Sequence, residues 1–165
     1  MVIFVIVDEI TFRFAGLSDI SAIREIERKS FSIPYSLGFL KRLLSTPQHF
    51  TIVAIYKEKI IGYVICRLES VGKGHIISLA VDPEFRGRGI GTKLMTRAIE
   101  ILKAKRCTYI YLEVRKSNYV AINLYKKLGF KIAGHIPLYY SDGEDAYIMV
   151  LNFRLSIPFD FSNFF

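Results

Sequence analysis

Runs of apolar residues alternate with short polar segments along the chain, and their spacing separates predicted strands from predicted helices. β-branched and aromatic runs are typical of strands, and they cover residues 2–7, 10–15, 50–56, 60–68, 75–81, 108–114, 130–136 and 144–153. Helical spacing and capping residues predict helices over residues 18–30, 36–45, 89–104 and 118–128. The order of these segments predicts a mixed α/β sheet and excludes a regular doubly wound array, because only one or two helices can connect neighbouring strands.

Capping and turn residues set the expected boundaries of these elements. Ser18 and Ser36 are good N-cap residues for the first two helices, and Pro34 interrupts the helical pattern between them. Gly129 is expected just after the last helix. The polar turn over residues 57–59 joins two strands into a hairpin, and the Ser-Asp-Gly turn over residues 141–143 predicts another.

Length and composition predict one domain over residues 1–165. Hydrophobic residues make up 52% of the 165, which is enough for a substantial core and argues against disorder. The expected core covers residues 10–153. An aromatic tail over residues 154–165 could pack on the body or mediate self-association, and the sequence leaves both open.

Charge and cysteine content narrow the class of protein further. The 23 Lys and Arg against 15 Asp and Glu give a formal charge of +8. This charge favours anionic partners such as nucleotide phosphates, acidic peptides or RNA, and it equally fits a solvated surface. Cys66 and Cys107 lie in apolar runs without a Cys-x-x-Cys partner, which is typical of buried thiols in a reducing cytosol. No segment reaches about 18 apolar residues, so no membrane span is predicted and a cytoplasmic protein is expected.

A glycine-rich turn, Arg86-Gly-Arg-Gly-Ile-Gly-Thr92, follows an apolar strand and precedes a helix. Glycines let the backbone approach a ligand closely, and the N–H groups of a helix N-terminus attract anions, so the turn suits a pyrophosphate. A P-loop is excluded because Leu94 follows Lys93 where Ser or Thr is needed. The dinucleotide fingerprint fails at Thr92, where it needs a third glycine. The alternative is a flexible connection that happens to be rich in glycine.

The wider segment around this turn carries a family resemblance. Residues 75–95, His-Ile-Ile-Ser-Leu-Ala-Val-Asp-Pro-Glu-Phe-Arg-Gly-Arg-Gly-Ile-Gly-Thr-Lys-Leu-Met, resemble the acetyl-CoA-binding core of the GNAT acetyltransferases. Residues 111–118 and 121–130 match the second half of that core, and the resemblance covers about residues 10–153. Within the family the chain is similar to N-terminal protein acetyltransferases of the ribosomal-protein-alanine type and of the Ard type, which shares the run Tyr139–Tyr147. This implies a GNAT fold, with a mixed, mostly antiparallel sheet of about seven strands flanked by about four helices.

The resemblance implies how acetyl-CoA would be held. Pantetheine would pair with the main chain of Leu79, Ala80 and Val81 where this strand splays from its neighbour, and the Leu79 N–H would polarise the thioester carbonyl. Asn118 and Tyr125 match positions that face the cofactor. Packing of the strand side chains and an ordinary N-cap role for Asn118 are the alternatives. The pyrophosphate would lie on the turn residues Arg86, Gly87, Arg88, Gly89, Ile90, Gly91 and Thr92.

Three residues are candidates for catalysis of the acetyl transfer. Glu113 lies in an otherwise apolar strand, where a carboxylate is costly unless it is paired or useful. By resemblance it is the general base, acting through water, and the alternative is a salt bridge to Arg115 or Arg67. His75 matches a position that some Ard-type relatives use to hold this water, with a structural role as the alternative. Tyr125 is the candidate general acid, with a place in the core as the alternative. His75 and Glu113 are too few ligands to predict a metal site.

The resemblance implies direct transfer to the N-terminal α-amine of proteins through a tetrahedral intermediate. An α-amine has a pKa of about 7.7–8.0 against about 10.4 for lysine, so a modest base suits N-termini. The first recognition loop lacks the glutamate of the Ard pattern Leu-Pro-Glu-Asn-Tyr, which leaves room for a larger apolar first residue such as Met-Leu. The residues expected to line the peptide site, for which ordinary packing is the alternative, are Phe31, Ile33, Pro34, Tyr35, Tyr139 and Tyr140.

Two other functions stay open on the sequence alone. One is a GNAT enzyme that acetylates lysine side chains or a small amine. The other is a basic ribosome- or RNA-binding module, although the chain has no RNA-reading motif and no sequence-specific nucleic-acid binding is predicted. Association with ribosomes, an auxiliary subunit and the oligomeric state are not decided by the sequence.

Overall fold

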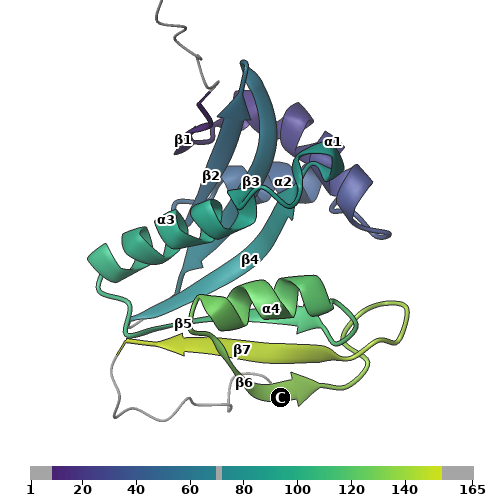
Figure 1. Cartoon of the computed structure of the whole chain (residues 1–165), viewed down its shortest axis with the longest axis vertical. Coiled ribbons are helices and arrows are strands. Elements are labelled where there is room, and N and C mark those ends of the chain that lie inside the picture. Colours follow the sequence, from purple (N-terminus) through teal and green to yellow (C-terminus); the bar gives the residue numbers. More distant parts are fainter. Residues whose placement is uncertain (1–8, 70–71, 154–165) are drawn as a thin grey trace, which may run out of the picture. The chain divides into compact units, whose positions relative to one another are not determined.

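The computed structural model describes residues 9–69 and 72–153 (Figure 1). The predicted strand over residues 2–7 and the tail over residues 154–165 lie outside the described residues. The chain divides into two compact units: Met1–Ile65 with Ser78–Leu94, and Cys66–Ile77 with Met95–Phe165.

Seven strands form a mixed sheet in the order β1-β2-β3-β4-β5-β7-β6. β1 pairs with β2, and β7 with both β5 and β6, in antiparallel fashion, whereas β4 and β5 are parallel. The predicted fold of about seven strands and four α-helices is confirmed. The strands are β1 Thr11–Phe14, β2 His49–Tyr56, β3 Lys59–Leu68, β4 Lys73–Val81, β5 Tyr109–Arg115, β6 Lys131–Ile136 and β7 Ala146–Asn152. The α-helices are α1 Ile20–Ser30, α2 Leu37–Ser45, α3 Ile90–Ala104 and α4 Tyr119–Lys127, and the 3-10 turns are η1 Leu17–Asp19 and η2 Pro83–Phe85.

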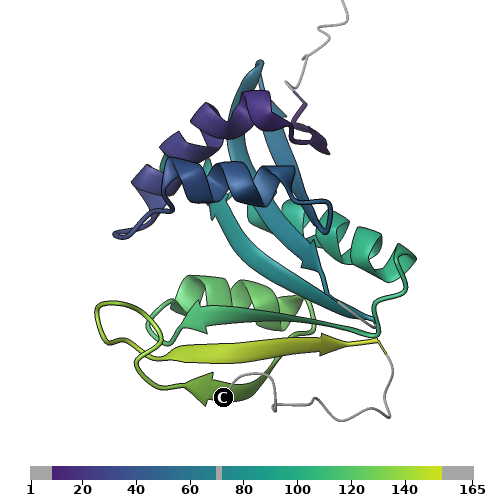
Figure 2. The same cartoon turned by 180° about the vertical axis from the view of Figure 1, so that it is seen from behind.

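In the first unit, α1 and α2 lie side by side over one face of β2 and β3 (Figure 2). Ile23 of α1 and Leu40 of α2 are fully buried in the core beneath them. The predicted N-cap of α2 is confirmed, because the Ser36 hydroxyl accepts a hydrogen bond from the Phe39 N–H at 3.2 Å. The β2–β3 hairpin turns where it was predicted, through residues 57 and 58 with φ of 46° and 64°, the left-handed conformation that tight hairpin turns require.

The start of the first helix differs from the prediction. Asp19, not Ser18, occupies the N-cap position of α1, and η1 precedes it. The Asp19 carboxylate accepts hydrogen bonds from the Gly16 N–H at 2.9 Å and from the Arg13 guanidinium at 2.7 Å, and the latter holds the pKa of Asp19 below its usual range. Ser18 was the wrong residue because it lies inside η1, whose start at Gly16 is closed by the Asp19 carboxylate, and α1 begins only after this turn.

In the second unit, α4 lies over one face of β5 and β7 (Figure 1). Gly129 follows α4 with φ of +94°, which confirms its predicted place after the helix. Cys66 and Cys107 are free, buried thiols, as predicted, and burial raises the pKa of both. Within the described ranges, none of the helices has the length and apolar character needed to cross a membrane.

Candidate active site

The glycine-rich turn belongs to the first unit and has a backbone suited to a ligand. Gly87 and Gly89 have φ of +76° and +74°, which glycine adopts without strain. A Cβ added to either glycine would meet no atom within 4 Å, so the turn borders open space. The Lys93 N–H donates to the Gly89 carbonyl at 3.0 Å as α3 begins. The N–H groups of Ile90 and Gly91 precede this bond and have no acceptor within the helix, so they can bind an anion.

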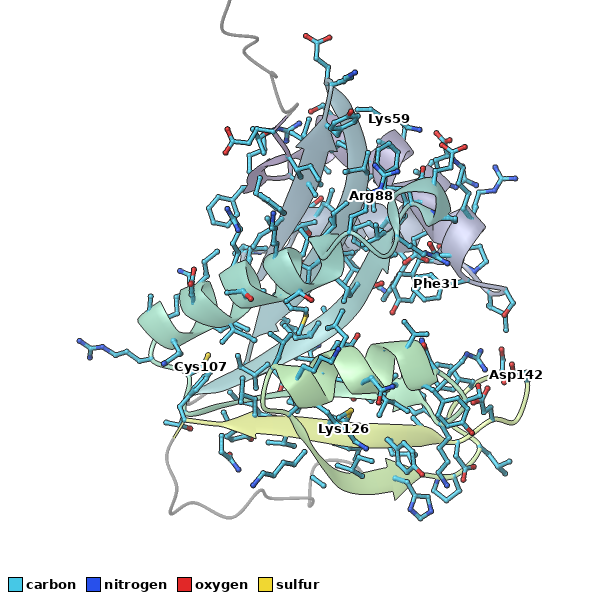
Figure 3. All side chains as sticks on the ribbon, viewed as in Figure 1. Phe31, Lys59, Arg88, Cys107, Lys126 and Asp142 are labelled. Atoms are coloured by element: carbon cyan, nitrogen blue, oxygen red, sulfur yellow. The ribbon has the colours of Figure 1, made fainter. Side chains whose placement is uncertain are left out.

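Two arginines of the turn, Arg86 and Arg88, supply positive charge. Arg86 donates from Nε to the Val81 carbonyl at 2.9 Å and from Nη2 to the Ser30 hydroxyl at 3.0 Å. The Arg88 guanidinium, labelled in Figure 3, lies 5.2 Å from the centre of the Phe85 ring. The side chain of Arg86 therefore ties the turn to α1 and to the end of β4.

The strand before the turn, β4, contains the predicted pantetheine-binding residues. Its parallel register joins residues 73–75 to residues 109–111 of β5, and β4 continues beyond these paired positions to Val81. Ala80 is buried, while Leu79 and Val81 are half-buried. Burial of these side chains is compatible with the predicted pantetheine binding, because that binding involves the backbone and not the side chains.

The structure brings His75 and Glu113 together, although 38 positions separate them in the sequence. Nε2 of His75 lies 2.7 Å from Oε2 of Glu113, and the two side chains are only 14% and 11% exposed. The parallel register places His75 opposite Tyr111, two residues from Glu113 on the same face of β5. An ionised carboxylate only accepts hydrogen bonds, so toward such a carboxylate Nε2 is the donor. Nδ1 of His75 is buried without a hydrogen-bond partner among the described residues.

The Tyr111 ring links a second carboxylate, that of Glu69, to this pair. The Tyr111 ring stacks on His75 at 4.3 Å with an interplanar angle of 6°, and its hydroxyl donates to Glu69 at 2.7 Å. Glu69 also bonds to the Arg67 guanidinium and lies 3.2 Å from the Lys73 ammonium. Burial and the neighbouring Glu69 raise the pKa of the Tyr111 hydroxyl, so this ring stays neutral and fixes one face of the imidazole.

The salt-bridge alternative for Glu113 named the wrong partners. Arg115 bonds to Asp142 and Glu144, each at 2.8 Å, and Arg67 bonds to Glu69. Sequence spacing could not identify these partners, because they depend on which residues of other strands and loops lie beside each side chain. Among the residues that the structure describes, no group of three or more His, Cys, Asp and Glu could hold a metal ion.

Tyr125 and Asn118 lie on α4 and at its start. Tyr125 is 7% exposed, packs against Phe130 at 5.9 Å, and has a hydroxyl pKa raised by burial. The ring of Tyr125 therefore lies in the core, as the alternative expected. Its role as a general acid stays a prediction. Asn118 caps α4 by accepting from the Ala121 N–H at 3.2 Å, so the N-cap alternative is observed, and its role toward a cofactor stays a prediction.

The first predicted recognition loop joins α1 to α2. Phe31, labelled in Figure 3, and Ile33 are 37% and 56% exposed, and Pro34 is half-buried. Tyr35 packs edge-on against Phe39 at 4.8 Å. Its N–H donates to Oε2 of Glu27 at 3.0 Å. The loop thus presents apolar side chains to solvent from a backbone that is held in place.

The second predicted recognition loop joins β6 to β7. Tyr139 is 46% exposed and meets Tyr140 edge to face at 5.0 Å. The Arg115 guanidinium lies 3.9 Å from the Tyr140 ring centre and bonds to Glu144. Hydrogen bonds from Ser117, followed by the one from Arg115, lower the pKa of Glu144 to about 2. Ionic contacts from the end of β5 therefore hold this loop.

Comparison with known proteins identifies the family. The sequence model of the acetyltransferase (GNAT) family matches residues 20–130. This chain belongs to the GNAT acetyltransferase family. It is 38% identical over 153 residues to an N-alpha-acetyltransferase of Sulfurisphaera tokodaii, covering 86% of this chain and 92% of that protein.

Two solved structures are similar to this chain in fold and sequence. The ribosomal-protein-S18-alanine N-acetyltransferase of Escherichia coli has a TM-score of 0.82 and 27% identity, covering 92% of this chain and 100% of that one. Naa50 of Arabidopsis thaliana, in complex with the bisubstrate analogue CoA-Ac-MVNAL, has a TM-score of 0.78 and 27% identity, covering 87% and 99%. The predicted resemblance to N-terminal acetyltransferases is confirmed.

Family membership does not test whether the predicted cofactor-binding and catalytic residues act together, so this stays a prediction. The glycine turn and residues 79–81 belong to the first unit, and Glu113, Asn118 and Tyr125 belong to the second. The sequence reasoning missed the buried Glu27 and the half-buried Glu69. A signal for Glu27 was present, because it lies four residues after Ile23 on the apolar stripe of α1, where a charge stands out.

Proposed function

We propose that this protein transfers the acetyl group of acetyl-CoA to the N-terminal α-amine of protein substrates. The observation that carries the proposal is the His75–Glu113 pair, a nearly buried carboxylate 2.7 Å from an imidazole in a chain of the GNAT family. The compared relatives are named as N-terminal acetyltransferases, which supports an enzyme over a nucleic-acid-binding module.

Acetyl-CoA supplies the acetyl group as an activated thioester. The turn of residues 86–92 fits its pyrophosphate, because two glycines with positive φ border open space at a helix N-terminus. In this proposal the main chain of Leu79, Ala80 and Val81 holds the pantetheine arm, and Asn118 and Tyr125 face the cofactor. The Leu79 N–H stabilises the oxyanion that develops as the amine attacks.

Glu113 acts as the general base in this proposal. It takes a proton from the attacking amine, directly or through a water that His75 helps to hold. The α-amine has a pKa of about 7.7–8.0, so it needs only a modest base, whereas lysine at about 10.4 needs a stronger one. Tyr125 donates a proton to the departing thiolate, which is a moderate leaving group with a thiol pKa of about 8–9.

Each of the two aromatic loops contributes residues that recognise the acceptor peptide in this proposal. Phe31, Ile33, Pro34 and Tyr35 come from the α1–α2 loop, and Tyr139 and Tyr140 from the β6–β7 loop. Their exposed apolar surface suits the first side chains of a peptide. Because the first loop carries no carboxylate, we expect large apolar first residues, as in Met-Leu, to be accepted.

Peptides with free and with blocked N-termini test the proposal. Purified protein is incubated with acetyl-CoA and peptides that differ in their first two residues, and product is followed by mass spectrometry. Acetylation confined to free N-termini is the expected result. Equal activity on blocked peptides that contain lysine would instead assign the enzyme to lysine or small-amine acetylation.

The setting of this activity follows from its substrate. We propose that the protein forms one domain and works in the cytoplasm, where new N-termini emerge and free thiols such as Cys66 and Cys107 persist. The net charge of +8 supports contact with an anionic partner such as the ribosome. Sedimentation of the protein with ribosomes at increasing salt concentrations tests this contact.

A further inference from the structure

A buried carboxylate on α1 has no role in the mechanism above. Glu27 is 1% exposed, and among the described residues it forms no ion pair. Its Oε1 accepts hydrogen bonds from the Tyr63 hydroxyl and, at 3.1 Å, from the Ser78 hydroxyl, and its Oε2 accepts from the Tyr35 N–H at 3.0 Å. A carboxyl group buried without a cation beside it is costly unless hydrogen bonds satisfy its oxygens, and here three donors do so.

Glu27 fixes both ends of the α1–α2 loop. Its main-chain carbonyl accepts from the Phe31 N–H at 2.9 Å, and its carboxylate accepts from the Tyr35 N–H. The exposed apolar residues of the loop, Phe31 and Ile33, therefore lie between two hydrogen bonds to one residue. Such bonds restrict the backbone of a loop that would otherwise sample many conformations.

The same carboxylate reaches β4 next to the predicted oxyanion donor. Ser78 precedes Leu79, and its hydroxyl lies 3.1 Å from Glu27 and 3.2 Å from the Tyr63 hydroxyl. All of these residues belong to the first unit. One buried group thus joins the loop that would hold the peptide to the strand that would hold the thioester.

We propose that Glu27 is a positioning residue that sets the α1–α2 loop for peptide binding. This role rests on the proposed function, because it requires the loop to contact the acceptor. The hydrogen bond to the Tyr35 N–H carries the effect, and the hydroxyl bonds of Tyr63 and Ser78 hold the carboxylate in place. Ordering the loop before the peptide arrives lowers the entropic cost of binding.

Glu27→Met tests this role, because methionine has a similar length and cannot accept these bonds. We expect the KM for a peptide with a free N-terminus to rise about tenfold, as the loss of one ordering hydrogen bond implies. The KM for acetyl-CoA should change less than twofold. Glu27→Gln should largely restore the peptide KM, because its carbonyl oxygen can face the Tyr35 N–H while the hydroxyls reorient.

Two control variants separate positioning from folding. Glu25→Met makes the same substitution at an exposed position of α1 and should leave both KM values unchanged. Tyr63→Phe removes one of the two hydroxyls that hold the carboxylate but keeps the bond to the Tyr35 N–H, so it should lower the melting temperature and raise the peptide KM less than Glu27→Met does. A Glu27→Met enzyme whose two KM values rise together, in parallel with its loss of stability, would show a purely structural role.

The wild-type enzyme separates failure of this role from failure of the proposed function. Wild-type activity on blocked peptides alone would overturn the proposed function and this role with it. Wild-type acetylation of free N-termini, combined with an unchanged peptide KM in Glu27→Met, would overturn only the role of Glu27.

Discussion

Replacing Glu113 with glutamine tests the centre of the mechanism with the smallest change in shape. The glutamine amide can still bond to His75, whose Nε2 lies 2.7 Å from the carboxylate, so the strand and the stacked Tyr111 ring should stay in place. What the substitution removes is the negative charge and the ability to take a proton. The variant therefore tests the function of Glu113 as a base without disturbing the surrounding structure.

The structure sets the size of the expected loss. A positioned general base contributes about 10²–10⁴ in rate. Glu113 is 11% exposed, so bulk water replaces it poorly. We therefore expect kcat of Glu113→Gln to fall by about 10²–10³, which is about 2.7–4.1 kcal/mol of transition-state stabilisation.

The assay measures kcat at saturating peptide and acetyl-CoA between pH 6 and 9. The loss should be largest at low pH and smaller at pH 9, because an α-amine with a pKa of about 7.7–8.0 is then mostly neutral without help. Acetyl-CoA affinity and melting temperature should stay close to wild type. Glu100→Gln, the same substitution at an exposed position of α3, is the matched control. Unchanged turnover across this pH range would remove Glu113 from its role.

Three further predictions follow from the same contacts. Tyr125→Phe should lower kcat about tenfold without abolishing it, because the thiolate can leave unprotonated; single-turnover kinetics measure this. Gly89→Ala should weaken acetyl-CoA binding measured by calorimetry, because φ of +74° costs an alanine about 1–2 kcal/mol. Glu144→Gln should lower the melting temperature above about pH 5. Since bonds from Ser117 and Arg115 lower the pKa of Glu144 to about 2, its stabilising effect is complete above the usual glutamate pKa of about 4.3 and disappears as the pH falls toward 2.

Each of these predictions has a control. A Tyr125→Phe enzyme with unchanged kcat would leave Tyr125 as a core residue only. Gly38→Ala, at a helical position with open space, should not alter acetyl-CoA affinity, and equal affinity in Gly89→Ala would contradict the proposed pyrophosphate site. For Glu144, a difference in melting temperature that persists unchanged down to pH 2 would show that the carboxylate charge contributes nothing to the loop.

Much of the architecture follows from local sequence. Alternating and helical patterns of apolar residues predicted the described strands and helices within a few residues, because side-chain periodicity differs between the two structures. Gly87 and Gly89 marked the turn before α3 because positive φ favours glycine over other residues. Glu113 was identifiable as an isolated charge in an apolar strand, and Ser36 as a cap, since each depends on near neighbours in the chain.

Only the tertiary structure decided which partners these side chains meet. The parallel register of β4 and β5 assigned His75 to Glu113 and left Arg115 and Arg67 to other carboxylates, and register depends on pairing between distant strands. Likewise, Glu27 is a charge on an apolar stripe in the sequence, and folding turns it into the acceptor that fixes a loop. Periodicity reports the face of an element on which a residue lies, whereas a hydrogen-bond partner depends on what packs against that face.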